Sequence, residues 1–229
     1  GYVGAWPYAE VKSGYTAFFL GARSVCPSAT MKVEYTNSWF NIALEKTAAE
    51  TLIAAGCVLL SQHADSEGAP KACEEAGIPN VAYNISTISI APNTALISSK
   101  IDWTPYMKLI IEKTRDGKGS EIPYDWCGGI KEGSVKLTEL NTACAAPGTQ
   151  EAIDAALEQF KAGTLKVFDT SKFTVGGKTL TEYMADVDSD AAFTPDTNVV
   201  HDGYFDESAD GKRSAPYFDI IIDGIEASK

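Results

Sequence analysis

Strand-like and helix-like patterns of apolar positions alternate along the first half of the chain. The opening run GYVGA is typical of a strand, and the next segment, 9–24, carries apolar side chains at helical spacing. Further strands are predicted at 31–36, 58–61, 79–84 and 95–98, and further helices at 41–55, 69–76 and 105–115. This alternation predicts an α/β fold with a parallel sheet flanked by helices and joined by right-handed crossovers.

The pattern changes most sharply in the stretch VLLSQHADS, residues 58–66. Val58, Leu59 and Leu60 form an apolar run without polar alternation, which is typical of a strand buried on both faces of a parallel sheet. Polar residues follow at the carboxyl end of this predicted strand. Because ligands of open α/β sheets bind outside the carboxyl ends of the strands, this stretch is the predicted centre of a binding site.

The regular alternation ends after residue 118. A strand is predicted at 124–129 and an amphipathic helix at 149–162, whereas 165–229 mixes short strands with glycine turns. The apolar run 218–225 is predicted to form a final strand or a short helix. The turns are expected at Gly176-Gly177, Asp202-Gly203 and Asp210-Gly211.

Charge and motif content narrow the classes of function. The 19 basic and 31 acidic residues give a net charge of -12, which repels nucleic acids and anionic membrane surfaces. The sequence contains no phosphate-binding loop pattern, no G-x-S-x-G and no H-E-x-x-H. It therefore nominates no cofactor and no catalytic machinery, and no nucleic acid is expected as a partner.

Trp39 lies in the run TNSWF, between a predicted strand and the helix that follows it. Its flat indole can stack on a planar ligand, an interaction worth about 1 to 3 kcal/mol for a nucleobase. The alternative is that Trp39 packs between helices, as large aromatic side chains usually do. Asn37 and Ser38 then act as helix caps.

Other polar residues follow neighbouring strands. Asp65 can accept paired hydrogen bonds from a ligand, or it can cap the next helix. Asn84 fits the same crevice, or it ends its strand with a local turn. His63 is interpreted as structural, because no metal ligand or nucleophile lies near it in the sequence. Farther along, Gly129 and Lys131 in GGIKEG would bring backbone N–H groups and a cation to a ligand, although a glycine pair alone is a weak signal.

Five separated runs together resemble one protein family. They are GYVGAWPYAEVKSGYTAFFLGARSVCP, VEYTNSWFN, SQHADSEGAPKACEEAGI, IDWTPYMKLIIE and WCGGIKEGSVKL, in the family's order. They resemble the basic membrane protein family of solute-binding lipoproteins, which serves ABC importers and includes purine nucleoside receptors. The resemblance covers most of residues 1–140. It implies a type I periplasmic-binding-protein fold, in which two α/β lobes enclose a purine nucleoside or nucleobase.

The resemblance also implies roles for individual residues. Trp39, or Phe40 beside it, matches the stacking platform, and Asp65 in HADS matches the ligand-binding acid of an HTDS-like motif. Asn84 matches the polar residue that closes the next strand, and Lys131 matches the lysine of a GGLKDG-like run. The sequence departs from the family where HADS replaces HTDS and where NISTIS replaces an N-x-D-M-like continuation.

By the same resemblance, residues 1–140 form the second, carboxyl-terminal α/β ligand-binding lobe, and residues 141–229 form a carboxyl-terminal helix and a crossover tail. Family members carry a first lobe ahead of GYVGA, so the chain is expected to be the second lobe and the tail with the first lobe missing. The implied partners are a purine and an ABC transporter permease. The implied location is extracytoplasmic, at the cell surface or in the periplasm, with a lipid anchor on the full-length form.

Two other classes of protein are compatible with such a fold. One is the ligand-sensing core of a transcriptional regulator, which would need a DNA-binding domain. The other is an α/β enzyme acting on nucleosides, which would need an acid, a base or a nucleophile in the crevice. Fold alone does not separate these classes. The five runs favour the solute-binding component of an importer, which is not an enzyme.

Overall fold

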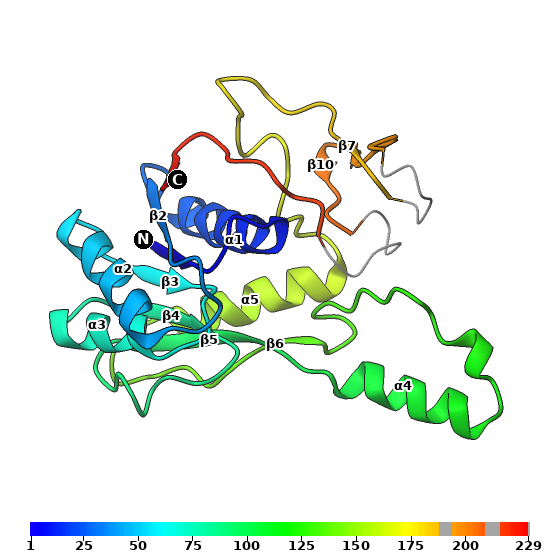
Figure 1. The fold of residues 1–229 in the computed structure, drawn as a ribbon, viewed down its shortest axis with the longest axis horizontal. Helices are drawn as coiled ribbons and strands as arrows, with labels where there is room; N and C mark the ends of the chain where they lie inside the picture. The colour runs from blue at the N-terminus through cyan, green and yellow to red at the C-terminus, as the bar shows by residue number, and fades with distance from the viewer. Residues whose placement is uncertain (188–193, 209–215, 229) are drawn as a thin grey trace.

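The computed structural model describes residues 1–187, 194–208 and 216–228 and centres on a seven-stranded sheet (Figure 1). The strand order is β11-β2-β1-β3-β4-β5-β6, and only the pair β5 and β6 is antiparallel. The strands are β1 (Tyr2–Gly4), β2 (Met31–Tyr35), β3 (Leu60–Gln62), β4 (Asn80–Tyr83), β5 (Ala95–Ile101), β6 (Val135–Leu137) and β11 (Ile225–Ala227). The predicted α/β fold with a parallel sheet is confirmed.

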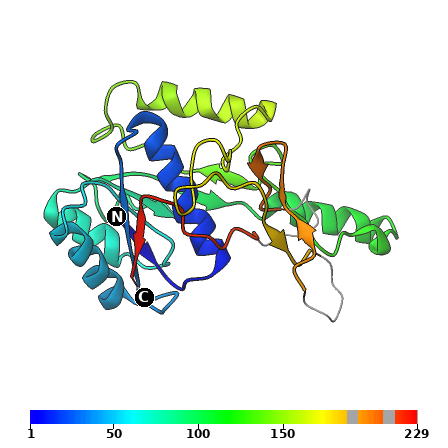
Figure 2. The same ribbon diagram turned by 90° about the horizontal axis from the view of Figure 1, so that it is seen from above.

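Helices lie on both faces of this sheet, with α1 on one side and α2 and α3 on the other (Figure 2). The helices are α1 (Ala9–Val25), α2 (Ile42–Ala54), α3 (Gly68–Ala76), α4 (Thr104–Arg115) and α5 (Thr149–Ala162), with a short 3-10 turn η1 (Gly119–Glu121) after α4. Each of the five predicted helices is present, and its ends fall within one residue of the predicted bounds. Apolar periodicity predicts the helix ends well because each pattern is bounded by a glycine, a proline or a polar cap.

The strand β1 connects the two hydrophobic cores, because successive side chains of a strand point to opposite faces of the sheet. Tyr2 packs with Val11 and Tyr15 of α1. Val3 packs on the other face with Leu52 of α2 and with the buried residues of α3. The central strand is thereby buried from both sides, as expected for a parallel sheet.

The strand predicted at 58–61 begins later than its apolar run indicates. Val58 is 76% exposed, and the sheet starts at Leu60, which is 1% exposed. Gly56, at a φ of +88°, ends the α2 segment, so residues 57–59 connect this helix to the start of β3. The prediction of a strand buried on both faces is therefore wrong for Val58 and correct for Leu60.

The helix α4 projects beyond the sheet (Figure 1), and none of its residues is buried. Tyr106 of α4 stacks on Trp126, with ring centroids 5.1 Å apart. A Cβ atom at Gly128 would lie 2.3 Å from the Trp126 ring, so a larger residue there would have to displace this ring. The strand predicted at 124–129 is wrong, because this ring contact folds the segment as a loop and the strand forms later, as β6.

The tail after α5 runs over α1 and adds the last strand to the sheet (Figure 1). Phe218 stacks on Phe168 at a centroid distance of 4.3 Å, and its ring meets Phe205 edge-on at 4.8 Å. Ile222 is buried in the same core, which includes α1. Phe218, Ile222 and Ile225 of the run 218–225 are thus buried, yet the run forms neither the predicted strand nor a helix, since β11 begins only at its last residue.

The tail also contains two short antiparallel pairs. These pairs are β7 (Met184–Ala185) with β8 (Thr197–Asn198), and β9 (Val200–His201) with β10 (Tyr204–Phe205). The predicted turns at Gly176-Gly177 and Asp202-Gly203 are confirmed by positive φ values at all four residues. The turn predicted at Asp210-Gly211 lies outside the described residues, and the predicted domain boundary at residue 140 stays a prediction. No helix of the described parts is long and apolar enough to cross a membrane.

The first prediction concerns the attachment of the tail. Phe218→Ala should lower the free energy of unfolding by about 3 to 5 kcal/mol, because it removes a fully buried ring from the core shared with α1. The matched control is Ile221→Ala, whose side chain is 44% exposed and which should have a much smaller effect. Urea unfolding measures both. Equal small losses would show that the tail is not part of the cooperative unit.

Candidate functional site

The carboxyl ends of β1 and β3 lie side by side at the point where the chain connections diverge. β1 pairs with β2 on one side and with β3 on the other, so the crossovers from β1 and from β2 leave the sheet in opposite directions. In doubly wound sheets this switch point forms a crevice that binds ligands. The loops that follow β1, β2 and β3 all open at this edge.

A row of aromatic rings lines this edge. Trp6 stacks on Tyr8 at 6.0 Å, and Tyr8 lies 6.2 Å from Trp39. Trp39 lies 6.4 Å from His63, which in turn lies 4.7 Å from Tyr83, all measured between ring centroids. These five rings come from the loops after β1, β2 and β3 and from the last residue of β4. We refer to them below as the aromatic row.

Two members of the aromatic row, Tyr8 and Trp39, are exposed to solvent. Trp39 is 37% exposed and Phe40 beside it is 64% exposed, so Trp39 is not a core residue packed between helices. Tyr8 is also exposed. Phe40 takes no part in the ring contacts described above. The row therefore offers open aromatic surface at the switch point.

A buried carboxylate fixes the loop that carries Trp39. Glu45 of α2 accepts a hydrogen bond from the backbone N–H of Asn41 at 3.0 Å and another from that of Ser66 at 3.0 Å. Asn41 caps the helix, since its side chain accepts from the N–H of Leu44 at 3.0 Å. Burial raises the pKa of Glu45, and these hydrogen bonds oppose the shift. The cap is therefore Asn41, and neither Asn37 nor Ser38 has this role.

The loop after β3 is held in the same way. The Gln62 side-chain amide is buried and donates to the carbonyl oxygens of Ala64, at 2.6 Å, and Ser66, at 3.0 Å. The backbone N–H of Asp65 donates to the carbonyl of Trp39 at 2.8 Å, which joins this loop to the one before it. The two loops thus form one connected unit.

The carboxylate of Asp65 does not cap the following helix. The Ser66 hydroxyl accepts from the N–H of Gly68 at 3.2 Å instead, and the N-cap residue of α3, Glu67, makes no side-chain capping bond. Asp65 is exposed and hydrogen-bonded to the side chain of Asn84. Partial burial raises the pKa of Asp65, whereas the Asn84 bond opposes this shift. Asn84 has a φ of +66°, so it both ends its strand and reaches the carboxylate.

Gly129 and Lys131 lie in the loop before β6, farther along the sheet. The backbone N–H of Gly129 donates to the Glu132 carboxylate at 2.9 Å. In the described parts of the chain, neither residue forms a hydrogen bond or an ion pair with Trp39 or Asp65. Their role at a ligand stays a prediction. The structure brings together Trp39, His63, Asp65 and Asn84, and adds Trp6, Tyr8 and Tyr83 to them.

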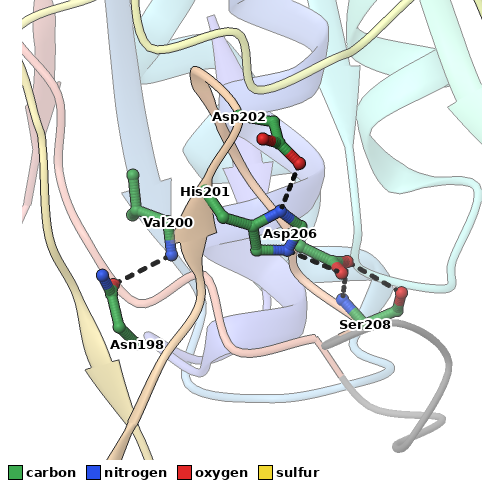
Figure 3. Close-up of polar contacts among 6 residues, drawn as sticks. All are labelled: Asn198, Val200, His201, Asp202, Asp206 and Ser208. Atoms are coloured by element: carbon green, nitrogen blue, oxygen red, sulfur yellow. Dashed lines mark hydrogen bonds and ion pairs between the residues drawn. The ribbon is translucent and has the colours of Figure 1, made fainter.

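A second polar cluster lies on the hairpin of β9 and β10 (Figure 3). His201 contacts Asp202 through Nδ1 at 3.4 Å and Asp206 through Nε2 at 3.5 Å. The Ser208 hydroxyl donates to the Asp206 carboxylate at 2.9 Å. In a nucleophilic triad the imidazole lies between the hydroxyl and the carboxylate, whereas here the carboxylate lies between the other two groups. The cluster is therefore not arranged to activate Ser208. Its contacts from His201 to Asp202 and Asp206 connect the two strands of the hairpin and its turn.

The fold is that of ABC-transporter solute-binding proteins. A solute-binding protein from Conexibacter woesei superimposes with a TM-score of 0.57 and 21% identity, over 72% of this chain and 55% of that one. A protein of the same class from Aeropyrum pernix gives a TM-score of 0.54 at 16% identity, over 73% and 56%. A transcriptional activator of the comK gene from Bacillus halodurans gives 0.55 at 17% identity, over 70% and 55%. At these identities the likeness concerns the fold alone.

Sequence comparison identifies the family. Residues 1–164 match the Bmp family, described as ABC transporter substrate-binding protein PnrA-like, and the chain belongs to this family. A putative ABC transporter glucose-binding protein of Haloferax volcanii is 34% identical over 76% of this chain, and a purine-binding protein of Brucella abortus is 36% identical over 60% of it. The matches span 44% and 39% of those two proteins. Because the family consists of binding proteins, the expectation that the chain is not an enzyme is confirmed.

The second prediction tests the support of the site loops. Glu45→Ala should lower the free energy of unfolding by about 2 to 4 kcal/mol, because it leaves the N–H groups of Asn41 and Ser66 without their acceptor. Glu50→Ala on the same helix is the control, since Glu50 is exposed and only 3.9 Å from Lys46 in a surface ion pair. Thermal unfolding compares them. If the two variants lose equally little stability, Glu45 does not hold the loops.

Proposed function

We propose that this chain is the ligand-binding part of the substrate-binding component of an ABC importer and that its ligand is a purine nucleoside or nucleobase. The observation that carries the proposal is the aromatic row with Asp65 beside it at the switch point of the sheet. Flat heterocycles stack on indole and phenol rings through their π faces. A carboxylate next to that platform accepts hydrogen bonds from paired N–H or O–H groups of the same ligand.

A sugar is the second candidate ligand. The Haloferax relative is named a putative glucose-binding protein, and the Brucella relative is named a purine-binding protein. An aromatic face with a carboxylate suits the C–H and O–H groups of a sugar as well. The number of rings in the aromatic row favours the purine, because a pyranose needs only one ring face whereas a purine gains from stacking on successive rings.

The proposal includes the partners and the location that go with such a protein. The partner is the permease of the importer, the location is extracytoplasmic, and the full-length form is held at the membrane by a lipid. These points are supported by the family, whose members are named as ABC transporter substrate-binding proteins. The net charge of -12 supports the absence of a nucleic-acid partner. The alternative that the chain is the ligand-sensing core of a transcriptional regulator is supported only by similarity of fold.

The third prediction tests the stacking platform. Trp39→Ala in the full-length protein should weaken adenosine or guanosine binding by about 1 to 3 kcal/mol, the range for a base stacked on an aromatic side chain. The control is Trp103→Ala at the N-cap of α4, an exposed indole that makes no ring contact with the aromatic row in the described residues. Isothermal calorimetry measures both. Unchanged affinity in a folded Trp39→Ala protein would contradict the stacking role.

The fourth prediction tests the carboxylate. Asp65→Asn should weaken purine binding at least about tenfold, because the amide replaces one of the two acceptor oxygens by a donor. Glu10→Gln provides the comparison, since Glu10 is an exposed carboxylate near Tyr83 and should matter less. Titrations with adenosine, guanosine, adenine and glucose separate the two candidate ligands. Tight glucose binding without purine binding would overturn the purine assignment.

A further inference from the structure

Ring contacts and a polar contact together hold His63 at the centre of the aromatic row. Its ring lies between Trp39 and Tyr83. Its Nδ1 atom lies 3.4 Å from the hydroxyl of Tyr2. The same side of the ring faces α1, where a Cβ at Gly14 would lie 2.9 Å from Nδ1. The ring therefore has one side against the protein core and little freedom to rotate.

The other nitrogen of this ring is open. Among the described residues, Nε2 of His63 has no hydrogen-bond partner. It is also not one of the buried polar atoms that lack a partner, so it is accessible to solvent. Burial lowers the pKa of His63 to about 4, so the imidazole is neutral under physiological conditions and carries one proton. The position of that proton decides what the open nitrogen offers to a ligand.

The Tyr2 hydroxyl determines the position of the proton. Tyr2 is only 4% exposed, and burial raises its pKa, so the hydroxyl keeps its hydrogen. Within the described chain the only polar partner of this hydroxyl is Nδ1 of His63. If Nδ1 carried the proton, the buried hydroxyl hydrogen would have no acceptor, which is costly. If the hydroxyl donates to Nδ1 instead, both groups are satisfied and the proton lies on Nε2.

We propose that His63 is a specificity-determining residue whose Nε2–H, oriented by Tyr2, donates a hydrogen bond to an acceptor atom of the ligand held on the aromatic row. The inference rests on the proposed function and refines it. The ligand must present a lone pair, such as a ring nitrogen or a carbonyl oxygen of a purine, toward the open side of His63. Tyr2 acts as a positioning residue, because it touches His63 and not the ligand.

The first part of the test uses nitrogen-15 NMR of the imidazoles. The sequence contains only two histidines, so His201 on the β9–β10 hairpin, which makes no ring contact with the aromatic row in the described residues, serves as an internal reference. In the free protein, Nε2 of His63 should give the shift of a protonated ring nitrogen and Nδ1 that of an unprotonated one. Tyr2→Phe should mix the two tautomers. A proton found on Nδ1 of the wild-type protein would overturn the proposal.

The second part measures adenosine affinity in the full-length protein. His63→Leu should bind about tenfold more weakly, whereas His63→Gln, which keeps an N–H donor near the position of Nε2, should stay within about threefold. His201→Gln should bind as the wild type does. Equal weakening by the Leu and Gln variants, or no weakening by either, would mean that His63 only fills space.

The two parts separate failure of the inference from failure of the function. If the wild-type protein binds neither adenosine, guanosine nor adenine, the purine function fails, and the role of His63 toward a purine fails with it. If the wild-type protein binds a purine while His63→Leu keeps its affinity, the function stands and only the inference is overturned. Addition of adenosine should also shift the Nε2–H signal of His63 and leave His201 unchanged.

Discussion

The position of β1 between β2 and β3 is the constraint on which the remaining structure depends. The backbone of β1 is hydrogen-bonded to a strand on each side. Side chains on its two faces pack into two different cores, one under α1 and the tail and one under α2 and α3. Such a strand has no exposed edge or face, so the polar residues that follow it can only emerge at its carboxyl end. That end is where the loops after β1, β2 and β3 meet and where the aromatic row forms.

The site is built on a rigid base rather than on free loops. The Glu45 carboxylate, the Gln62 amide and the backbone bond between Asp65 and Trp39 join the loops after β2 and β3. Side chains at the surface of this unit remain exposed, whereas the groups beneath them are buried and satisfied. A binding surface with its supporting hydrogen bonds already made loses little freedom when a ligand arrives, which favours affinity.

Much of this arrangement follows from sequence patterns, and the failures have physical causes. All five helices follow from apolar spacing, and Asp65 and Asn84 meet because parallel strands end at one edge. The strand at 124–129 was mispredicted because a ring contact between distant residues overrides local pattern. Val58 was misplaced because an apolar run does not show where a turn ends. Trp6 and Tyr8 carried a signal, since WPY follows the first strand, and the same edge rule applied to that strand identifies them.

Indole NMR of the full-length protein tests the central claim most directly, because two of the four tryptophans of this chain belong to the aromatic row. Trp6 and Trp39 belong to the aromatic row, whereas Trp103 lies at the start of α4 and Trp126 stacks on Tyr106. Adding adenosine should shift the indole N–H signals of both Trp6 and Trp39, because both rings belong to the aromatic row. No shift of either signal at saturating adenosine would contradict a purine site at the carboxyl ends of β1 and β3.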